Sequence, residues 1–198
     1  MYGEGLELPV KMEYDLNLAQ KAYQLAERWD SARETETSKL DFSESDLKEF
    51  NSSQKSWAKI LSFRSTSVTH LYFIVVFLEC LQSFPSLPSH LIIYLGDLYK
   101  FKNTFNAELR FRFYGVAFSD PSSTAAKTLV TDAAKWLIGD DETGVIKGRM
   151  KFCRPVFLSV WRVDKDLAVR SWEKAQKKFH PIARKLIEKV NEVGLGRT

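Results

Sequence analysis

The chain has 198 residues, of which 44% are hydrophobic and 27% are charged, and its formal net charge is +4. These values are typical of a globular domain and exclude a disordered or fibrous chain. A chain of this length can bury enough surface to hold a core without disulfides or metal ions. Its two cysteines, Cys80 and Cys153, are too few for a zinc-type cysteine site and predict a reducing, cytoplasmic location.

Neither an export signal nor a membrane span is predicted. The first residues lack the basic and apolar regions of a signal peptide. The most apolar stretch, residues 71–78, is far shorter than the roughly 20 residues that a membrane-spanning helix needs. We interpret this stretch as buried core.

The charge is uneven along the chain, with an acidic start up to residue 50 and a basic region at residues 162–189. A basic end could bind phosphates or an anionic surface. The bases there alternate with acids at helical spacing, however, which favours a solvated helix face over nucleic-acid binding. No nucleic-acid partner is therefore expected.

The hydrophobic periodicity is helical along almost the whole chain. In its first half, Asp15 is expected to cap a helix that reaches residue 29, and Ser43 with Asp46 resembles a capping box. Ser52 or Ser53 could cap the next helix. The predicted ranges are 15–29, 43–50 and, after a break at the prolines near residue 86, 90–101.

In the second half, Asn106 is expected to cap a helix, and Ser122 or Ser123 to cap another that reaches residue 137. A polar break at 139–148 precedes predicted helices at 151–162 and 164–178, the latter capped by Asp164, and a last helix with Pro181 in its first turn. About eight or nine helices and no convincing strand result. The short links predict an all-α, two-layer stack of antiparallel helix pairs, although no repeat of fixed period is visible.

The common catalytic motifs are absent from the sequence. None of the histidines, His70, His90 and His180, belongs to an H-E-x-x-H motif, and each is interpreted as structural. There is also no nucleophile elbow, no Walker loop and no dinucleotide-binding turn. Cys153 has basic neighbours but no histidine base beside it, so a catalytic cysteine is not expected.

The most informative segment is residues 148–157, with the sequence GRMKFCRPVF. Arg149, Lys151 and Arg154 place three cations within six residues at the expected start of a helix, where anions are favoured. Arg149 offers a planar fork suited to a carboxylate, Lys151 offers a mobile point charge, and Gly148 supports them with an accessible backbone. The segment is a candidate carboxylate or phosphate site. The alternative is that these cations are merely solvated.

At this segment the sequence resembles the C-terminal helical domain of the leukotriene-A(4) hydrolase and aminopeptidase B family of zinc metallo-aminopeptidases. The resemblance covers most of the chain and implies an α-α superhelix, similar to armadillo or HEAT stacks, packed against a thermolysin-like catalytic domain. It rests on ordered motifs at residues 2–6, 28–29, 42–48, 106–113, 148–157, 164–165, 168–170 and 180–181.

The resemblance also implies a function for the GRMKF segment, which reaches the active-site cleft in that family. There Arg149 and Lys151 would hold the free carboxylate of a peptide or lipid-acid substrate. The parent enzymes perform proteolysis by removing N-terminal residues from peptides, and some of the family hydrolyse epoxides. Arg110 and Arg112 match the family as well, and we assign them to structural pairing with Glu108 or with neighbouring helices.

In this family the zinc ligands and the general base lie upstream in the catalytic domain. This chain is therefore expected to hold no metal or cofactor and to have no activity alone, with the catalytic domain of the same enzyme as its partner. Residues 1–14 are interpreted as a linker from that domain and residues 15–198 as the C-terminal helical domain. The alternative is a free-standing, non-catalytic helical module for protein interactions.

Residues 55–74 have no counterpart in the family pattern. We interpret them as an atypical insertion, and two origins stay open: an unspliced intron read in frame, or a lineage-specific loop. Either would crowd or lengthen a helix of the stack.

Overall fold

The computed structural model describes residues 17–48 and 65–195. These residues form helices, turns and loops without any strand, which confirms the predicted all-α class. The α-helices are α1 (Asn17–Ser31), α2 (Ser45–Lys48), α3 (Ser65–Ser83), α4 (Ser89–Leu98), α5 (Ala107–Ala117), α6 (Thr124–Ile138), α7 (Met150–Val163), α8 (Lys165–Ala175) and α9 (Pro181–Leu195). Short 3-10 helices are η1 (Thr37–Lys39), η3 (Phe101–Asn103) and η4 (Gln176–Lys178).

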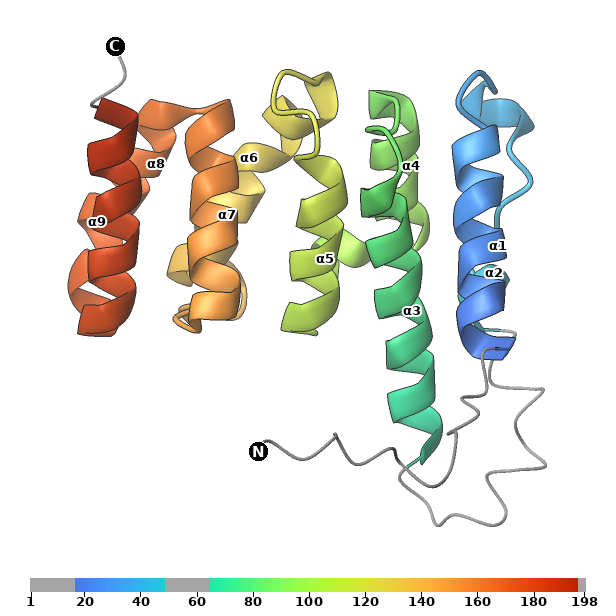
Figure 1. Cartoon of the computed structure of the whole chain (residues 1–198), viewed down its shortest axis with the longest axis horizontal. Helices are drawn as coiled ribbons and strands as arrows, with labels where there is room; N and C mark the ends of the chain where they lie inside the picture. Colours follow the sequence, from blue (N-terminus) through green and yellow to red (C-terminus); the bar gives the residue numbers. More distant parts are fainter. Residues whose placement is uncertain (1–16, 49–64, 196–198) are drawn as a thin grey trace, which may run out of the picture.

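The helices form two layers. In Figure 1, α1, α3, α5, α7 and α9 stand side by side in front, and α4, α6 and α8 lie behind them. Each front helix contacts the next, and within the back layer α4 contacts α6 and α6 contacts α8. Between the layers, α6 contacts α5 and α7, and α8 contacts α7. Each back helix returns the chain, so the front helices all start at the same edge of the molecule. The predicted stack of helix pairs is confirmed.

Most predicted caps are present. Asn106, Ser123 and Asp164 each accept a hydrogen bond from a backbone N–H in the first turn of α5, α6 and α8. Of the two serines that the sequence left open, Ser123 and not Ser122 is the cap of α6. Pro181 is the first residue of α9, as expected. Three other expected caps, Asp15, Ser52 and Ser53, lie outside the described residues.

The predicted helix at 90–101 is too long. It ends at Leu98, and Lys100 takes a left-handed conformation with a φ of 56°. This turn reverses the chain direction so that Phe101, which is 2% exposed, enters the core from a separate 3-10 turn. Burial of a side chain of this size contributes about 2 kcal/mol, which outweighs the cost of one left-handed residue.

One other helix is also shorter than predicted. The helix at 164–178 ends at Ala175 and tightens into η4, which covers the remaining three residues. Of the helix predicted at 43–50, residues 45–48 are helical as α2, and residues 49 and 50 lie outside the described part of the chain. The expected capping contact is present there, because the Asp46 carboxylate accepts the Ser43 N–H at 2.8 Å.

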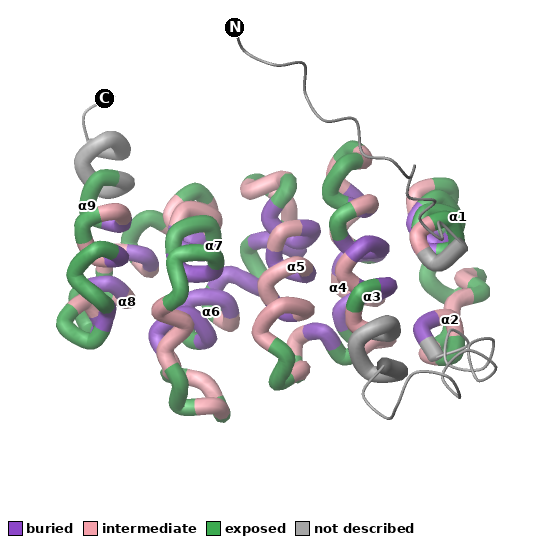
Figure 2. The backbone as a smooth tube through the Cα atoms, turned by 60° about the horizontal axis from the view of Figure 1, so that its bottom comes forward, coloured by how far each residue is buried: buried purple, intermediate pink, exposed green. Residues whose placement is uncertain are grey.

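The core lies between the two layers, and buried residues recur along the described helices (Figure 2). The apolar stretch 71–78 lies within α3 and is buried at Phe73, Ile74, Phe77 and Leu78, which confirms that it is core. None of the described helices is long and apolar enough to cross a membrane.

The proposed insertion lies partly in α3. Residues 65–74 form the first half of this helix, which extends past its neighbours at the lower edge of Figure 1. Residues 55–64 lie outside the described part of the chain. The insertion therefore stays a prediction, and its last two residues, Phe73 and Ile74, are buried in the core.

Candidate functional site

The candidate site begins where α7 begins. Arg149 is the N-cap residue and Met150 the first helical residue, one residue before the predicted start. The Arg149 side chain is exposed and makes no cap hydrogen bond. Within the described part of the chain, its guanidinium has no hydrogen-bond or ion-pair partner. Arg149 is thus a free cation at a helix end whose backbone N–H groups already favour an anion.

Lys151, the second predicted ligand, is tethered. Its Nζ lies 2.6 Å from Oε2 of Glu108, which stands in the first turn of α5. The Lys151 side chain remains 54% exposed, so the ammonium group still faces solvent. The two predicted ligands therefore differ: Arg149 is free, and a neighbouring helix fixes Lys151.

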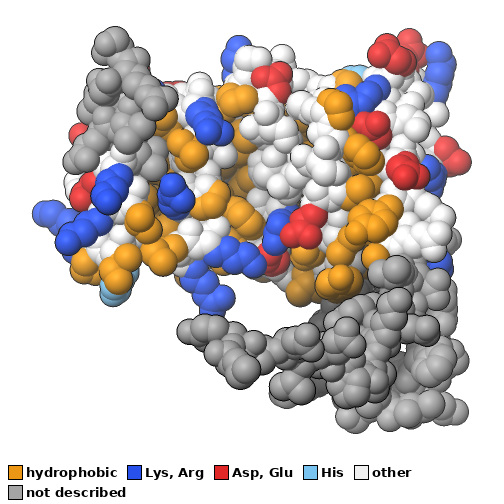
Figure 3. Space-filling view, viewed as in Figure 1, with side chains coloured by type: hydrophobic (Ala, Val, Ile, Leu, Met, Phe, Trp, Pro, Cys, Tyr) orange, Lys and Arg blue, Asp and Glu red, His pale blue; other side chains and the backbone are white. Residues whose placement is uncertain are grey.

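Glu108 is part of a row of charges across three front helices. Nε of Arg112 lies 3.1 Å from Oε1 of Glu108, and its Nη1 pairs with Glu79 of α3. Burial alone would raise the pKa of the Glu108 carboxyl, but Lys151 and Arg112 outweigh this effect and hold the pKa below its ordinary value. The predicted pairing of Arg112 with Glu108 is confirmed. In Figure 3, blue and red side chains meet low on this face, between α5 and α7.

Gly148 precedes the cations in an ordinary backbone conformation. It is absent from the residues with positive φ, and a Cβ built on it would meet nothing closer than Cγ2 of Ile146 at 4.0 Å. The space over Gly148 is therefore open. This agrees with a backbone that a ligand can approach, which stays a prediction.

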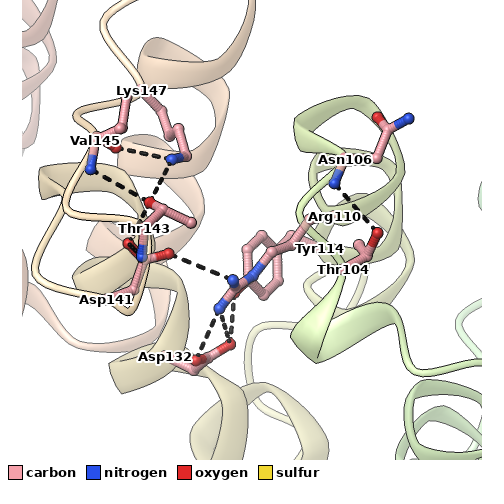
Figure 4. A network of polar contacts seen from close by, with 9 residues as sticks. All are labelled: Thr104, Asn106, Arg110, Tyr114, Asp132, Asp141, Thr143, Val145 and Lys147. Carbon is pink, nitrogen blue, oxygen red and sulfur yellow. Dashed lines mark hydrogen bonds and ion pairs between the residues drawn. The ribbon is translucent and has the colours of Figure 1, made fainter.

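Arg110 belongs to a separate, buried network (Figure 4). It is only 6% exposed, and its Nη2 lies 3.1 and 3.2 Å from the two carboxylate oxygens of Asp132 on α6. Its Nη1 lies 3.4 Å from Asp141, and its Nε donates to the Tyr114 hydroxyl at 3.0 Å. The expected structural role is confirmed through neighbouring elements and not through Glu108. Sequence analysis missed Asp132 and Asp141 because nothing in their local sequence marks them as partners.

A comparison with protein families shows to which family this chain belongs. The family model described as leukotriene A4 hydrolase, C-terminal, matches residues 70–190, which is more than half of the chain. The chain belongs to this family. Its GRMKF segment and the paired Arg112 and Glu108 lie within the matched residues.

Relatives of this chain are much longer proteins. It is 31% identical over 183 residues to leucine aminopeptidase 2 of Neurospora crassa, covering 92% of this chain and 22% of that protein. It is 32% identical over 184 residues to a leukotriene A-4 hydrolase homolog of Botryotinia fuckeliana, covering 92% of this chain and 23% of the homolog. The chain thus spans about a quarter of the length of these relatives.

The same fold occurs in a solved structure of native yeast LTA4 hydrolase. The TM-score is 0.67 at 23% sequence identity, with 93% of this chain and 27% of the yeast chain covered. At this identity the likeness shows the fold alone, and it agrees with the two-layer helical stack of the family.

Two histidines contact backbone atoms, one distant in sequence and one nearby. The His90 Nε2 lies 3.3 Å from the Thr35 carbonyl oxygen, and the His180 Nδ1 accepts the Ile182 N–H at 3.3 Å. The His70 side chain lies outside the described part of the chain. Among the described residues, no group of three or more His, Cys, Asp and Glu is placed to hold a metal ion. These residues therefore offer no fit for the zinc that the aminopeptidase family implies.

Proposed function

We propose that this chain is the C-terminal helical domain of a zinc aminopeptidase and completes its substrate cleft without catalysing the reaction itself. Membership of the leukotriene A4 hydrolase C-terminal family supports this role, as do the longer relatives named as aminopeptidases. The partner would be the catalytic domain of the same enzyme, which would hold the zinc and remove N-terminal residues from peptides. The free thiols of Cys80 and Cys153 support a cytoplasmic location.

Within this domain, Arg149 and Lys151 would hold the free carboxylate of a peptide or lipid-acid substrate. One observation carries the proposal: the Arg149 guanidinium is exposed and unpaired within the described residues, at the N-terminus of α7 and next to the tethered Lys151. A planar guanidinium can bind a carboxylate with two parallel hydrogen bonds. A cationic anchor at the end of a packed helix would set how deeply a substrate enters and so bring its reacting bond to the catalytic centre.

The test of this role is kinetic. In the enzyme that contains this domain, Arg149→Ala should lower kcat/KM for peptides with a free carboxylate by roughly 10- to 100-fold, because charge-assisted hydrogen bonds contribute about 1.5–3 kcal/mol. Neutral aminoacyl-arylamides should be cleaved almost as before. Arg162→Ala removes an exposed cation from the last turn of α7, away from this segment, and serves as the matched control. An equal loss on both substrate classes would assign Arg149 a structural role instead.

A second experiment separates this proposal from the free-standing module. An in-frame H-E-x-x-H motif upstream of this sequence in the gene would support the enzyme, and its absence from the transcript would favour the module. Chelator-sensitive hydrolysis of an aminoacyl-arylamide by this chain alone would contradict the proposal, because the chain is assigned no catalysis of its own.

A further inference from the structure

Glu108 pairs with the candidate ligand Lys151 of α7 on one side and with Arg112 of α5 on the other. Its Oε2 lies 2.6 Å from Lys151 Nζ, and its Oε1 lies 3.1 Å from Arg112 Nε. Arg112 also pairs with Glu79. This row of two acids and two bases is neutral as a unit, and it places a full negative charge directly beside one of the two cations expected to bind the substrate.

We infer that Glu108 is a specificity-determining residue, which reduces the advantage that a doubly charged phosphonate or phosphate would have over a singly charged carboxylate at this cationic site. The inference rests on the proposed function of Arg149 and Lys151. An anion that contacts the Lys151 ammonium must also come close to the Glu108 carboxylate, which is paired with that ammonium. The repulsion from Glu108 grows in proportion to the charge of the anion, so a dianion is penalised about twice as much as a monoanion.

The geometry keeps this negative charge in place. The Glu108 side chain is 22% exposed, and it is held by cations on both carboxylate oxygens. Because those ion pairs keep its pKa below the ordinary value, Glu108 is ionised at neutral pH. Its distance from Lys151 is fixed by two packed helices, α5 and α7, which contact one another directly.

Glu108 also holds Lys151 still, and this second effect must be separated from the charge effect. Loss of the tether frees the lysine and weakens the binding of every anion to a similar degree. Loss of the negative charge strengthens the binding of a dianion more than that of a monoanion. The ratio of the two affinities therefore isolates the charge effect.

The experiment measures this ratio with the whole 198-residue chain. The probes are acetyl-Ala-Ala, with its single carboxylate, and its C-terminal phosphonate analogue, titrated at pH 8 and followed by NMR. Glu108→Gln should shift the affinity ratio toward the phosphonate by about fivefold, the size expected for one charge at close range in a half-exposed site. Glu173→Gln, which removes one exposed acid of α8, is the matched control and should leave the ratio unchanged.

Glu108→Asp keeps the charge while shortening the side chain, so it should retain the wild-type ratio of carboxylate to phosphonate affinity. An unchanged ratio in a folded Glu108→Gln chain that binds both probes would overturn the inference and leave the carboxylate site intact. Two other results would overturn both the inference and the proposed carboxylate site. These are a wild-type chain that binds neither probe, and carboxylate binding that Arg149→Ala leaves unaltered.

Discussion

Nζ of Lys151 lies 2.6 Å from Oε2 of Glu108, which binds the first turn of α7 to the first turn of α5. Both turns lie at the edge of the stack where all front helices begin. The position of the lysine ammonium is therefore set by a neighbouring helix and not only by the rotamers of a flexible side chain. This places a defined cation two residues along the chain from the free Arg149.

The pH dependence of stability provides a test of this ion pair. Lys151→Met should lower the free energy of unfolding by less than about 1 kcal/mol at pH 7, because the lysine is half-exposed. Although burial raises the pKa of Glu108, its ion pairs lower it overall in the folded state, so they stabilise the fold above the ordinary carboxyl pKa. That contribution is lost as the pH falls through the lowered value.

Urea unfolding at pH 7 and near pH 3 measures this dependence. The difference between wild type and Lys151→Met should shrink in acid, whereas Lys185→Met, at an exposed lysine of α9, should show no such trend. A difference that is the same at both pH values would mean that the pair does not link Glu108 ionisation to folding.

The buried network around Arg110 is expected to matter far more for stability. Arg110→Met leaves Asp141, whose side chain is 7% exposed, without its cation and should cost about 3 kcal/mol or more. The measurement is again the free energy of unfolding in urea. Arg154→Met on the exposed face of α7 should cost less than about 0.5 kcal/mol. Similar costs for both variants would show that the network does not stabilise the fold.

Two glycines are expected to respond differently to alanine. A Cβ at Gly148 meets no atom closer than 4.0 Å, so Gly148→Ala should change the unfolding free energy by less than about 0.5 kcal/mol. Gly139 has a φ of +69°, and a Cβ there would lie 2.8 Å from the backbone N of Ile146. Gly139→Ala should therefore cost about 2 kcal/mol or more. If Gly148→Ala destabilises the chain equally, the space over Gly148 is not open as described.

Much of the fold could be predicted from the sequence because helix starts are local signals. Asn106, Ser123 and Asp164 cap their helices through bonds that span two or three residues, and the sequence shows such spacing directly. The end of α4 could not be predicted. The left-handed turn at Lys100 is stabilised by the fit of Phe101 into the core, where its ring lies against Tyr99 and against Phe113 of the next helix, α5, and this packing does not show in the sequence around Lys100.

The candidate site divides in the same way. The cations of the GRMKF segment could be predicted because they lie within a few residues of one another. The family could be predicted from the ordered motifs. The partners of these cations are not. Glu108 reaches Lys151, and Asp132 reaches Arg110, only because the stack brings α5 beside α7 and α6.

The central claim is that Arg149 anchors a free carboxylate. The most direct measurement is an NMR titration of the wild-type and Arg149→Ala chains with an acetylated tripeptide and with its C-terminal amide. The account predicts that wild type binds the acid more tightly than the amide, and that Arg149→Ala raises the Kd of the acid about tenfold or more without affecting the amide. Equal binding of acid and amide by wild type, or an unchanged Kd of the acid in Arg149→Ala, would contradict it.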